Sequence, residues 1–170
     1  MDGTMLRDAR VKKKWTQQDA ALALGVTQAY LSMLEKGHRA VSDRLVLKAH
    51  KVLNLSPTVL PLKPEEETMS ATLHKLDFSA ELGALGYPGF SYHPARRRHN
   101  PAEVLSSALN EPDLDARVAE GLPWLALVYL DMDWDWLVRN AKLHDRQNRS
   151  PLAEHWNLLT DLKEEHLAYA

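Results

Sequence analysis

Apolar side chains recur at helical spacing through the first sixty residues, with polar capping residues and glycines between the runs. This pattern predicts short helices rather than strands. Thr16 and Thr27 each precede an apolar run and are good N-cap residues. They open a second predicted helix over residues 17–24 and a third over residues 28–35, after a first that contains Leu6.

A fourth helix is predicted over residues 43–53. Its inward side chains are expected to be Leu47, Ala49 and Val52. Ser56 and Pro57 then form an N-cap followed by a proline at the first helical position, which predicts a short fifth helix.

The chain changes character after this fifth helix. Residues 61–80 start with Pro-x-x-Pro and three consecutive glutamates, a composition that favours an exposed linker, which we place over residues 63–80. Residues 81–100 hold several glycines and prolines and are predicted to be loop. Helical patterns then resume in four segments. These are residues 101–109, residues 114–129 with an interruption near 121–123, residues 133–145 and residues 151–167.

The predicted fold class is all-α, because no two-residue alternation of apolar and polar positions is convincing and the chain contains no isoleucine. The predicted organisation is an N-terminal domain over residues 1–62, a linker over residues 63–80 and a helical domain over residues 81–170. The last of these is expected to serve dimerisation and partner binding.

Composition narrows the class of protein. Hydrophobic residues make up 45% and charged residues 26% of the 170 residues, the balance of a soluble globular protein. Cysteine is absent, which excludes disulfides and thiolate metal sites and fits a reducing compartment. The first ten residues do not resemble a signal peptide, and the longest apolar stretch, residues 122–130, is too short to span a bilayer. We expect a cytoplasmic protein.

The distribution of charge is uneven. Residues 1–60 contain ten Lys/Arg and five Asp/Glu, a formal charge of +5, so the remainder carries −7 within the stated total of −2. A basic half joined to an acidic half suggests two domains with different partners. The basic half suits a polyanion such as DNA.

Residues 16–35, TQQDAALALGVTQAYLSMLE, carry a specific motif. Thr-Gln-x-x-Ala opens the second predicted helix, Gly-Val-Thr forms the turn, and Tyr-Leu-Ser-x-Leu-Glu-x-Gly runs along the third. The segment closely resembles the helix-turn-helix of the Cro/C1-type (XRE) repressors, over about residues 5–61. The resemblance implies a five-helix, lambda-repressor-like DNA-binding domain whose third helix enters the major groove.

The resemblance also implies which side chains meet double-stranded DNA. Gln17 corresponds to a glutamine that binds a backbone phosphate, and Gln28 sits where a side-chain amide can pair with adenine. The full expected set is Gln17, Thr27, Gln28, Ala29, Ser32, Lys36, His38 and Arg39. Simple solvent exposure remains the alternative for Gln28 and Ser32.

Two further features of the basic half bear on its structure. Arg10 and Glu35 resemble the internal ion pair that joins the first and third helices in many such repressors, a structural role. The run Lys12-Lys13-Lys14 has two open interpretations, a solvated helix end or a phosphate contact.

No enzyme motif occurs in the chain. G-x-x-x-x-G-K-[ST], G-x-G-x-x-G and H-E-x-x-H are all absent, and there is no thiol for cysteine catalysis. The histidines of the second half are scattered, so neither a metal site nor a cofactor is predicted. Asp131, Asp133 and Asp135 alternate with Met and Trp, which favours a helix start over a calcium loop.

Aromatic residues are frequent in the second half. Trp124, Trp134, Trp136 and Trp156 are candidates for a partner-binding surface, because tryptophan anchors interfaces. The alternative is that they form the core of a small domain. Residues 122–149 also resemble the C-terminal modules of abortive-infection-type antitoxins, through Leu-Pro, Asp-Trp-x-x-Leu, Ala-Lys and Gln-Asn-Arg. Ser150-Pro151 then departs from the expected Gly-aromatic pair.

These observations predict a sequence-specific repressor that is a homodimer and the autoregulating antitoxin of a cognate toxin protein. Two other hypotheses remain open at this point. One is a ligand-responsive repressor with a C-terminal sensor and dimerisation domain. The other is a protein-binding scaffold whose helix-turn-helix no longer binds DNA.

Overall fold

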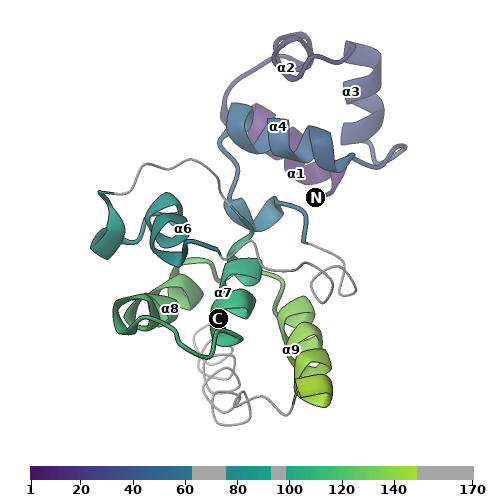
Figure 1. Cartoon of the computed structure of the whole chain (residues 1–170). Helices are drawn as coiled ribbons and strands as arrows, with labels where there is room; N and C mark the ends of the chain where they lie inside the picture. The colour runs from purple at the N-terminus through teal and green to yellow at the C-terminus, as the bar shows by residue number, and fades with distance from the viewer. Residues whose placement is uncertain (63–75, 93–98, 149–170) are drawn as a thin grey trace. The chain divides into compact units, whose positions relative to one another are not determined.

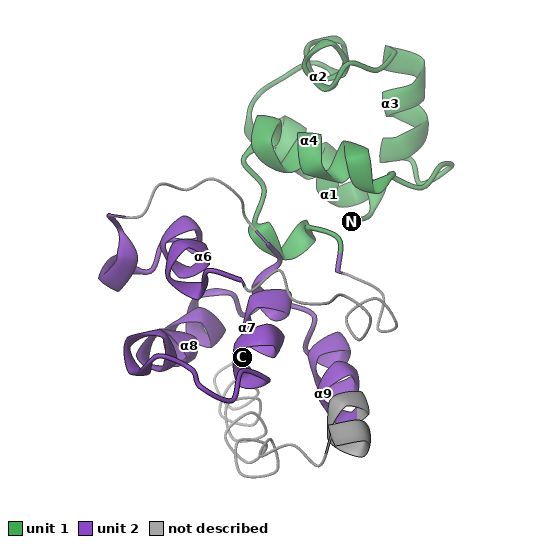
Figure 2. Ribbon diagram, in the orientation of Figure 1, with its two compact units in different colours: residues 1–61 green, residues 62–170 purple. Residues whose placement is uncertain are grey.

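The computed structural model describes residues 1–62, 76–92 and 99–148, the last six of these by backbone alone. Its described residues form α-helices and two 3-10 helices, with no strand among them. The chain divides into two compact units, residues 1–61 and 62–170 (Figure 1, Figure 2). The fold class is all-α, as the sequence predicted.

Four α-helices build unit 1. They are α1 (Gly3–Lys12), α2 (Gln17–Leu24), α3 (Gln28–Glu35) and α4 (Asp43–Leu53). Helices α2 and α3 lie side by side at one edge of the unit, and each contacts a helix of the α1–α4 pair (Figure 1). Leu6, Leu31 and Leu34 are fully buried at the centre of this unit. A small core can therefore hold the four helices at fixed angles.

Two details of unit 1 differ from the sequence prediction. In place of a fifth α-helix, the chain forms a single 3-10 turn, η1 (Pro57–Val59), capped by the Ser56 hydroxyl. Leu47 was expected to face inward, but it is 47% exposed. The buried face of α4 instead passes through Leu45, Val46, Ala49 and Leu53. This face keeps helical spacing but is rotated by about one position from the predicted one.

The prediction of loop over residues 81–100 was wrong in its first part, and helix already begins within the predicted linker. Helix α6 (Phe78–Leu85) starts at the Asp77 N-cap and ends at Gly86, whose φ of 101° is the left-handed conformation that glycine adopts without strain. A 3-10 turn, η2 (Pro88–Phe90), follows. The glycines and prolines here end and connect short helices rather than preventing them.

Three longer helices complete the described part of unit 2. They are α7 (Pro101–Leu109), α8 (Ala116–Val128) and α9 (Trp134–Asn148). The predicted interruption near residues 121–123 was wrong, because α8 continues through Pro123. Proline costs a helix one backbone hydrogen bond. The buried side chains of Leu122 and Leu125 on either side of it offset that loss by packing.

Helix α7 lies at the centre of unit 2, in contact with α6, α8 and α9. Most of its side chains are buried, as expected for a helix covered on several sides. Ser106 of α7 accepts a hydrogen bond from the Asn140 side-chain amide of α9 over 2.6 Å. A polar contact in an apolar core fixes the register of two helices, because a shift would leave the buried groups unsatisfied.

Several predictions fall outside the described residues. These are the linker over residues 63–75, the helix over residues 151–167 and the candidate interface residue Trp156. Within the described residues, no helix has the length and apolar character needed to cross a membrane.

Candidate nucleic-acid interface

The N-terminus of α2 is built by a capping box. The Thr16 hydroxyl accepts a hydrogen bond from the backbone N–H of Asp19 over 3.1 Å, and the Asp19 carboxylate accepts the backbone N–H of Thr16. Hydrogen bonds from the Thr16 hydroxyl and backbone lower the pKa of Asp19. The first N–H groups of α2, which begin at Gln17, have no acceptor within the helix and can meet an anion.

The turn between α2 and α3 needs a glycine. Gly25 has φ of 69°, and its N–H donates to the carbonyl of Leu22. The N–H of Val26 then reaches back to the carbonyl of Ala21. Ala20 and Ala21 are buried and small, so α3 can pack closely on α2. This is the tight crossing that a helix-turn-helix requires.

Helix α3 has one buried face and one exposed face. Leu31, Leu34 and Glu35 are buried, whereas Gln28 and Ala29 at its N-terminal end are exposed. Ser32, one turn further, is partly exposed. The Thr27 hydroxyl caps the helix by accepting the backbone N–H of Tyr30 over 3.2 Å. Short polar and apolar side chains are therefore presented together at the end of α3 that the sequence predicted would meet base edges.

The loop after α3 carries three exposed basic side chains. Gly37 has φ of 72° and turns the chain, and the N–H of His38 donates to the carbonyl of Met33. Lys36, His38 and Arg39 are exposed, and none makes a side-chain hydrogen bond or ion pair with the described part of the chain. They are accordingly available for phosphate.

A largely buried ion pair joins α1 to the end of α3. The Arg10 Nε donates to Glu35 Oε1 over 2.6 Å and its Nη2 to Oε2 over 3.1 Å. Its Nη1 also donates to the carbonyl of Trp15 over 2.9 Å. Arg10 and Glu35 are thus in contact as the sequence predicted, and they join α1, the chain before α2 and the end of α3.

Glu35 has a second partner residue that sequence reasoning missed. Gln17 Nε2 donates to Glu35 Oε2 over 2.8 Å, so the residue predicted to bind phosphate through its amide is held by the ion pair. Burial acts to raise the pKa of Glu35. Hydrogen bonds from Arg10 and Gln17 and the charges of Arg10 and Arg7 outweigh it, and the pKa is lowered. Glu35 therefore remains a carboxylate that orients both side chains.

The three consecutive lysines at residues 12–14 have different surroundings. Lys13 Nζ donates to the carbonyl of Val52 over 2.8 Å, near the C-terminus of α4, and lies 5.1 Å from the centre of the Trp15 ring. A cation is favourable at a helix C-terminus and over an aromatic face. Lys13 thus has a structural role, while Lys12 and Lys14 remain exposed.

The comparisons with known proteins agree with this geometry. The family model described as helix-turn-helix matches residues 6–60. Residues 6–60 are a helix-turn-helix domain of the XRE type. Such domains occur in DNA-binding transcription regulators, and the capped α2, the glycine turn and the exposed end of α3 are the parts they require. No curated protein and no solved structure matches the chain significantly.

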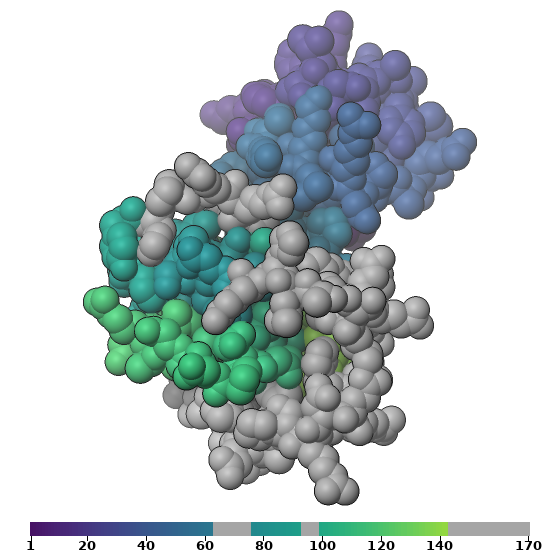
Figure 3. Space-filling model, viewed as in Figure 1, coloured from purple at the N-terminus to yellow at the C-terminus, as the bar shows by residue number. Residues whose placement is uncertain are grey.

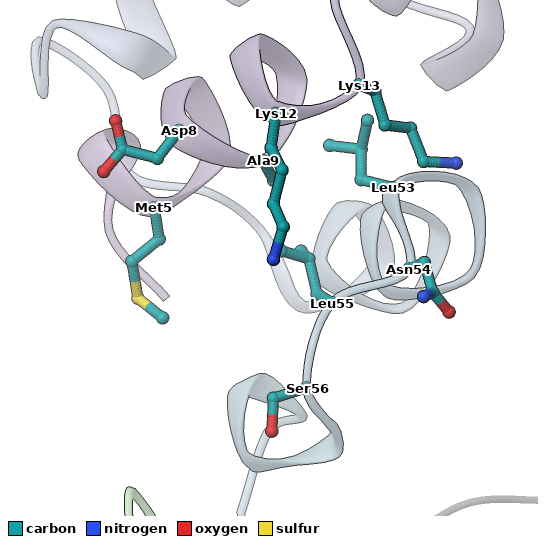
Figure 4. Close-up of a pocket in the computed structure, with 9 residues that line it drawn as sticks. All are labelled: Met5, Asp8, Ala9, Lys12, Lys13, Leu53, Asn54, Leu55 and Ser56. Atoms are coloured by element: carbon teal, nitrogen blue, oxygen red, sulfur yellow. The ribbon is translucent and has the colours of Figure 1, made fainter.

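The helix-turn-helix domain also contains a pocket on its α1–α4 side (Figure 4). The pocket has a volume of about 540 Å³ and lies between α1 and the residues that follow α4. Met5, Ala9 and Leu55 supply apolar walls, and Lys12 extends from α1 toward Leu55 (Figure 4). No local sequence pattern predicts this pocket, because residues far apart in the chain line it.

The predicted partner-binding tryptophans have different surroundings. Trp136 is only 7% exposed and belongs to the core of unit 2, so it offers almost no surface to a partner. Trp124 is partly buried, with its ring centre 5.3 Å from that of Tyr87 and 6.5 Å from that of Tyr129. Trp134 is partly exposed, and its indole N–H donates to the carbonyl of Leu130 over 3.2 Å. The alternative of a core role thus holds for Trp136.

Proposed function

We propose that this chain is a sequence-specific repressor whose α3 reads base edges in the major groove. The observation that carries the proposal is the division of α3 into a buried face and an exposed N-terminal end that bears Gln28 and Ala29. A glutamine amide can pair with both N6 and N7 of adenine, and a methyl group can contact thymine. Lys36, His38 and Arg39, in the loop that follows the other end of α3, supply phosphate contacts.

We further propose that the repressor acts as a homodimer. One helix-turn-helix makes too few contacts for tight operator binding, so two copies would read inverted half-sites about one helical turn apart. Dimer contacts are assigned to residues after 62, which form a separate compact unit.

We infer that the second unit binds a partner protein, a toxin encoded beside this chain, which makes the chain an autoregulating antitoxin. The charge division supports this inference, since a unit of −7 is repelled by phosphate and has a different partner from the unit of +5. Both functions could then operate at once, with the first unit on an operator and the second on the toxin.

The pocket in the helix-turn-helix domain favours a second candidate function, a ligand-responsive repressor. Its volume of about 540 Å³ lies in the range of small-molecule sites. Its lining combines apolar side chains with polar and charged ones, namely Met5, Ala9, Leu53 and Leu55 with Asp8, Lys12, Lys13, Asn54 and Ser56. The ligand would then act from the DNA-binding unit itself rather than from a C-terminal sensor. This function is tested by adding small carboxylates to the purified repressor–operator complex and measuring whether DNA is released.

The repressor function is tested by selecting duplexes that the intact chain retains and then measuring the affinity of variants by gel shift. Gln28→Ala is expected to weaken binding to the selected operator by about 1–3 kcal/mol and to relax preference at one base pair. Gln18→Ala is the matched control, an exposed glutamine of α2, and should leave base preference unchanged. Unchanged operator affinity of Gln28→Ala would show that α3 is not docked as proposed.

A further inference from the structure

The pocket in the helix-turn-helix domain has two charged side chains of opposite sign in its lining. Asp8 and Lys12 lie four residues apart on α1, and both line the pocket. Both side chains are exposed. Figure 3 shows the surface of unit 1, in purple and blue, to which α1 and α4 both contribute. Because the two charges are exposed, a ligand can reach them from solvent.

The domain itself does not use these two charges. An aspartate and a lysine at positions i and i+4 of a helix often form an ion pair. Here neither side chain makes an ion pair or a hydrogen bond with the part of the chain that the structure describes. Figure 4 shows the Lys12 side chain extending toward Leu55 and the Asp8 carboxylate directed away from it. A ligand therefore meets both charges without first breaking an ion pair.

The other lysine of the pocket is already occupied. Lys13 Nζ donates to the carbonyl of Val52 over 2.8 Å and lies 5.1 Å from the centre of the Trp15 ring. Lys12 is therefore the lysine of the pocket that is open to a carboxylate. Asp8 supplies the carboxylate of the lining, among the residues that the structure describes.

Four apolar side chains belong to the same lining. They are Met5 and Ala9 on α1, and Leu53 and Leu55 at and after the end of α4. Leu53 is only 4% exposed and belongs to the core of the domain, whereas Met5 is 40% exposed. The thioether of methionine packs favourably against an aromatic ring. The pocket, of about 540 Å³, thus suits a ligand with a large apolar body, such as an aromatic ring.

We propose that this pocket binds an α-amino acid with a large apolar side chain, whose ammonium group pairs with Asp8 and whose carboxylate pairs with Lys12. Residues at i and i+4 of a helix have Cβ atoms about 5–6 Å apart, so they can hold opposite charges that lie close together in one ligand. The ammonium and carboxylate groups of an α-amino acid are attached to the same carbon atom. This proposal rests on the ligand-responsive function given above and names the class of ligand.

A ligand with a single charge fits this lining less well. A carboxylate without an amino group brings its negative charge near Asp8, and an amine without a carboxylate brings its positive charge near Lys12. Like charges placed together in a binding site disfavour the wrong partner. An amino acid offers each side chain an opposite charge instead. Analogues that lack one of the two groups therefore test the proposal.

The experiment measures binding of L-phenylalanine to the intact chain by titration calorimetry. Two analogues serve for comparison: 3-phenylpropanoate lacks the ammonium group, and 2-phenylethylamine lacks the carboxylate. Phenylalanine is expected to bind at least about ten-fold more tightly than either analogue, because each removes a hydrogen bond between charged groups. Equal affinity for all three ligands would overturn the proposal and leave an apolar pocket that can still serve the ligand-responsive function.

Two variants assign the charges to their residues. Asp8→Asn should weaken phenylalanine binding by about ten-fold or more, while 3-phenylpropanoate keeps or gains affinity. Lys12→Gln should weaken phenylalanine binding to a similar extent, while 2-phenylethylamine keeps or gains affinity. Asp43→Asn and Lys14→Gln are the matched controls, because both residues are exposed charges of unit 1 outside the pocket lining. Circular dichroism shows that each variant is folded.

The remaining outcomes separate the ligand from the function. Phenylalanine affinity that is unchanged in both Asp8→Asn and Lys12→Gln would overturn the proposal, because the amino acid would then bind elsewhere. Failure of all three ligands to bind would overturn it too, and the release of operator by other small carboxylates would still decide the ligand-responsive function. Binding that depends on both residues but leaves operator affinity unchanged in a gel shift would support the site and contradict that function.

Discussion

Arg10 and Glu35 form a two-point contact between the first and third helices of the helix-turn-helix domain, with the shorter of its two hydrogen bonds at 2.6 Å. Their side chains are 13% and 3% exposed. Water therefore cannot replace either partner readily. Removing one of them leaves a buried charge with too few partners, and that is more damaging than losing a surface pair.

Arg10→Met is expected to lower the free energy of unfolding of the domain by about 3 kcal/mol. The measurement is urea unfolding of a 1–62 fragment, which contains the whole core of unit 1 and one tryptophan, Trp15, as a fluorescent probe. Arg10→Met with Glu35→Leu should recover part of the loss, because no charge is then stranded. A double variant as unstable as the sum of the two single variants would exclude the coupling seen here.

The stability of the same domain should depend on the protonation of Glu35. Its pKa lies below the ordinary value of 4.5, so the unfolded chain takes up a proton at higher pH than the folded chain does. The stabilisation is therefore complete above the ordinary pKa and is lost as the pH falls toward the lowered one.

Unfolding free energies of the 1–62 fragment and of Glu35→Gln, measured from about pH 7 to about pH 3, test this dependence. The difference between the two proteins should be largest near neutrality and shrink on acidification. Because Asp2 and Asp19 also have lowered pKa values in both proteins, subtraction removes their contribution. A difference that stays constant with pH would mean that Glu35 does not ionise differently in the folded state.

Gly3 is required for the approach of α1 to α3. A Cβ at this position would overlap the carbonyl oxygen of Leu34, which accepts the N–H of Gly37 at the end of α3. Backbone held in this way cannot move aside as a flexible side chain can. Gly3→Ala should therefore cost about 1–3 kcal/mol of stability, as overpacking does, despite the better helix propensity of alanine. Asp8→Ala, an exposed change on the same helix, is the control in thermal unfolding.

The sequence was sufficient to predict the helix-turn-helix because its signals are local. Thr16 and Thr27 each cap a helix by accepting the N–H of the residue three positions later. Gly25 adopts the left-handed backbone conformation, which glycine reaches without strain because it has no side chain. Helix α7 has the same kind of local features, since Asn100 caps it and Pro101 occupies its first position. Such features can be predicted without knowing which residues pack against them.

The features that were missed depend on contacts between distant residues. Helix α8 tolerates Pro123 because of packing on either side, which no local propensity reveals. Gln17 is directed by Glu35, eighteen residues away. Leu127 and Leu130 are exposed although they lie in the same apolar stretch as the buried Leu125, and only the packing of the helices decides which of them form the core.

The division into two units leads to a prediction about assembly. Unit 1 has its own core, so the 1–62 fragment should fold alone. It should sediment as a monomer, whereas the full chain should sediment as a dimer and bind duplexes with two half-sites about 10 base pairs apart. A fragment that dimerises as strongly as the full chain would place the dimer contacts in unit 1 instead.

Gln17 connects the structural network to the DNA surface, and its variants separate the two roles. Gln17→Ala removes one hydrogen bond to a carboxylate and should cost about 1.5 kcal/mol of stability. It should also weaken all duplexes evenly, because a residue at the start of α2 meets backbone rather than bases. Gln17→Glu should lower both stability and DNA affinity further. The new carboxylate would repel the Glu35 carboxylate in the folded domain and the phosphates of DNA in the complex.

The measurement is the affinity of each variant for the operator duplex and for a random-sequence duplex, both titrated at one fixed salt concentration. The ratio of operator to random affinity should be unchanged in Gln17→Ala and reduced in Gln28→Ala. The two glutamines are thereby distinguished by the pattern of loss rather than by its size. If Gln17→Ala changed preference at a single base pair while leaving stability intact, then Gln17 would reach a base in the complex. In that case the contact between Gln17 and Glu35 must be released on binding DNA.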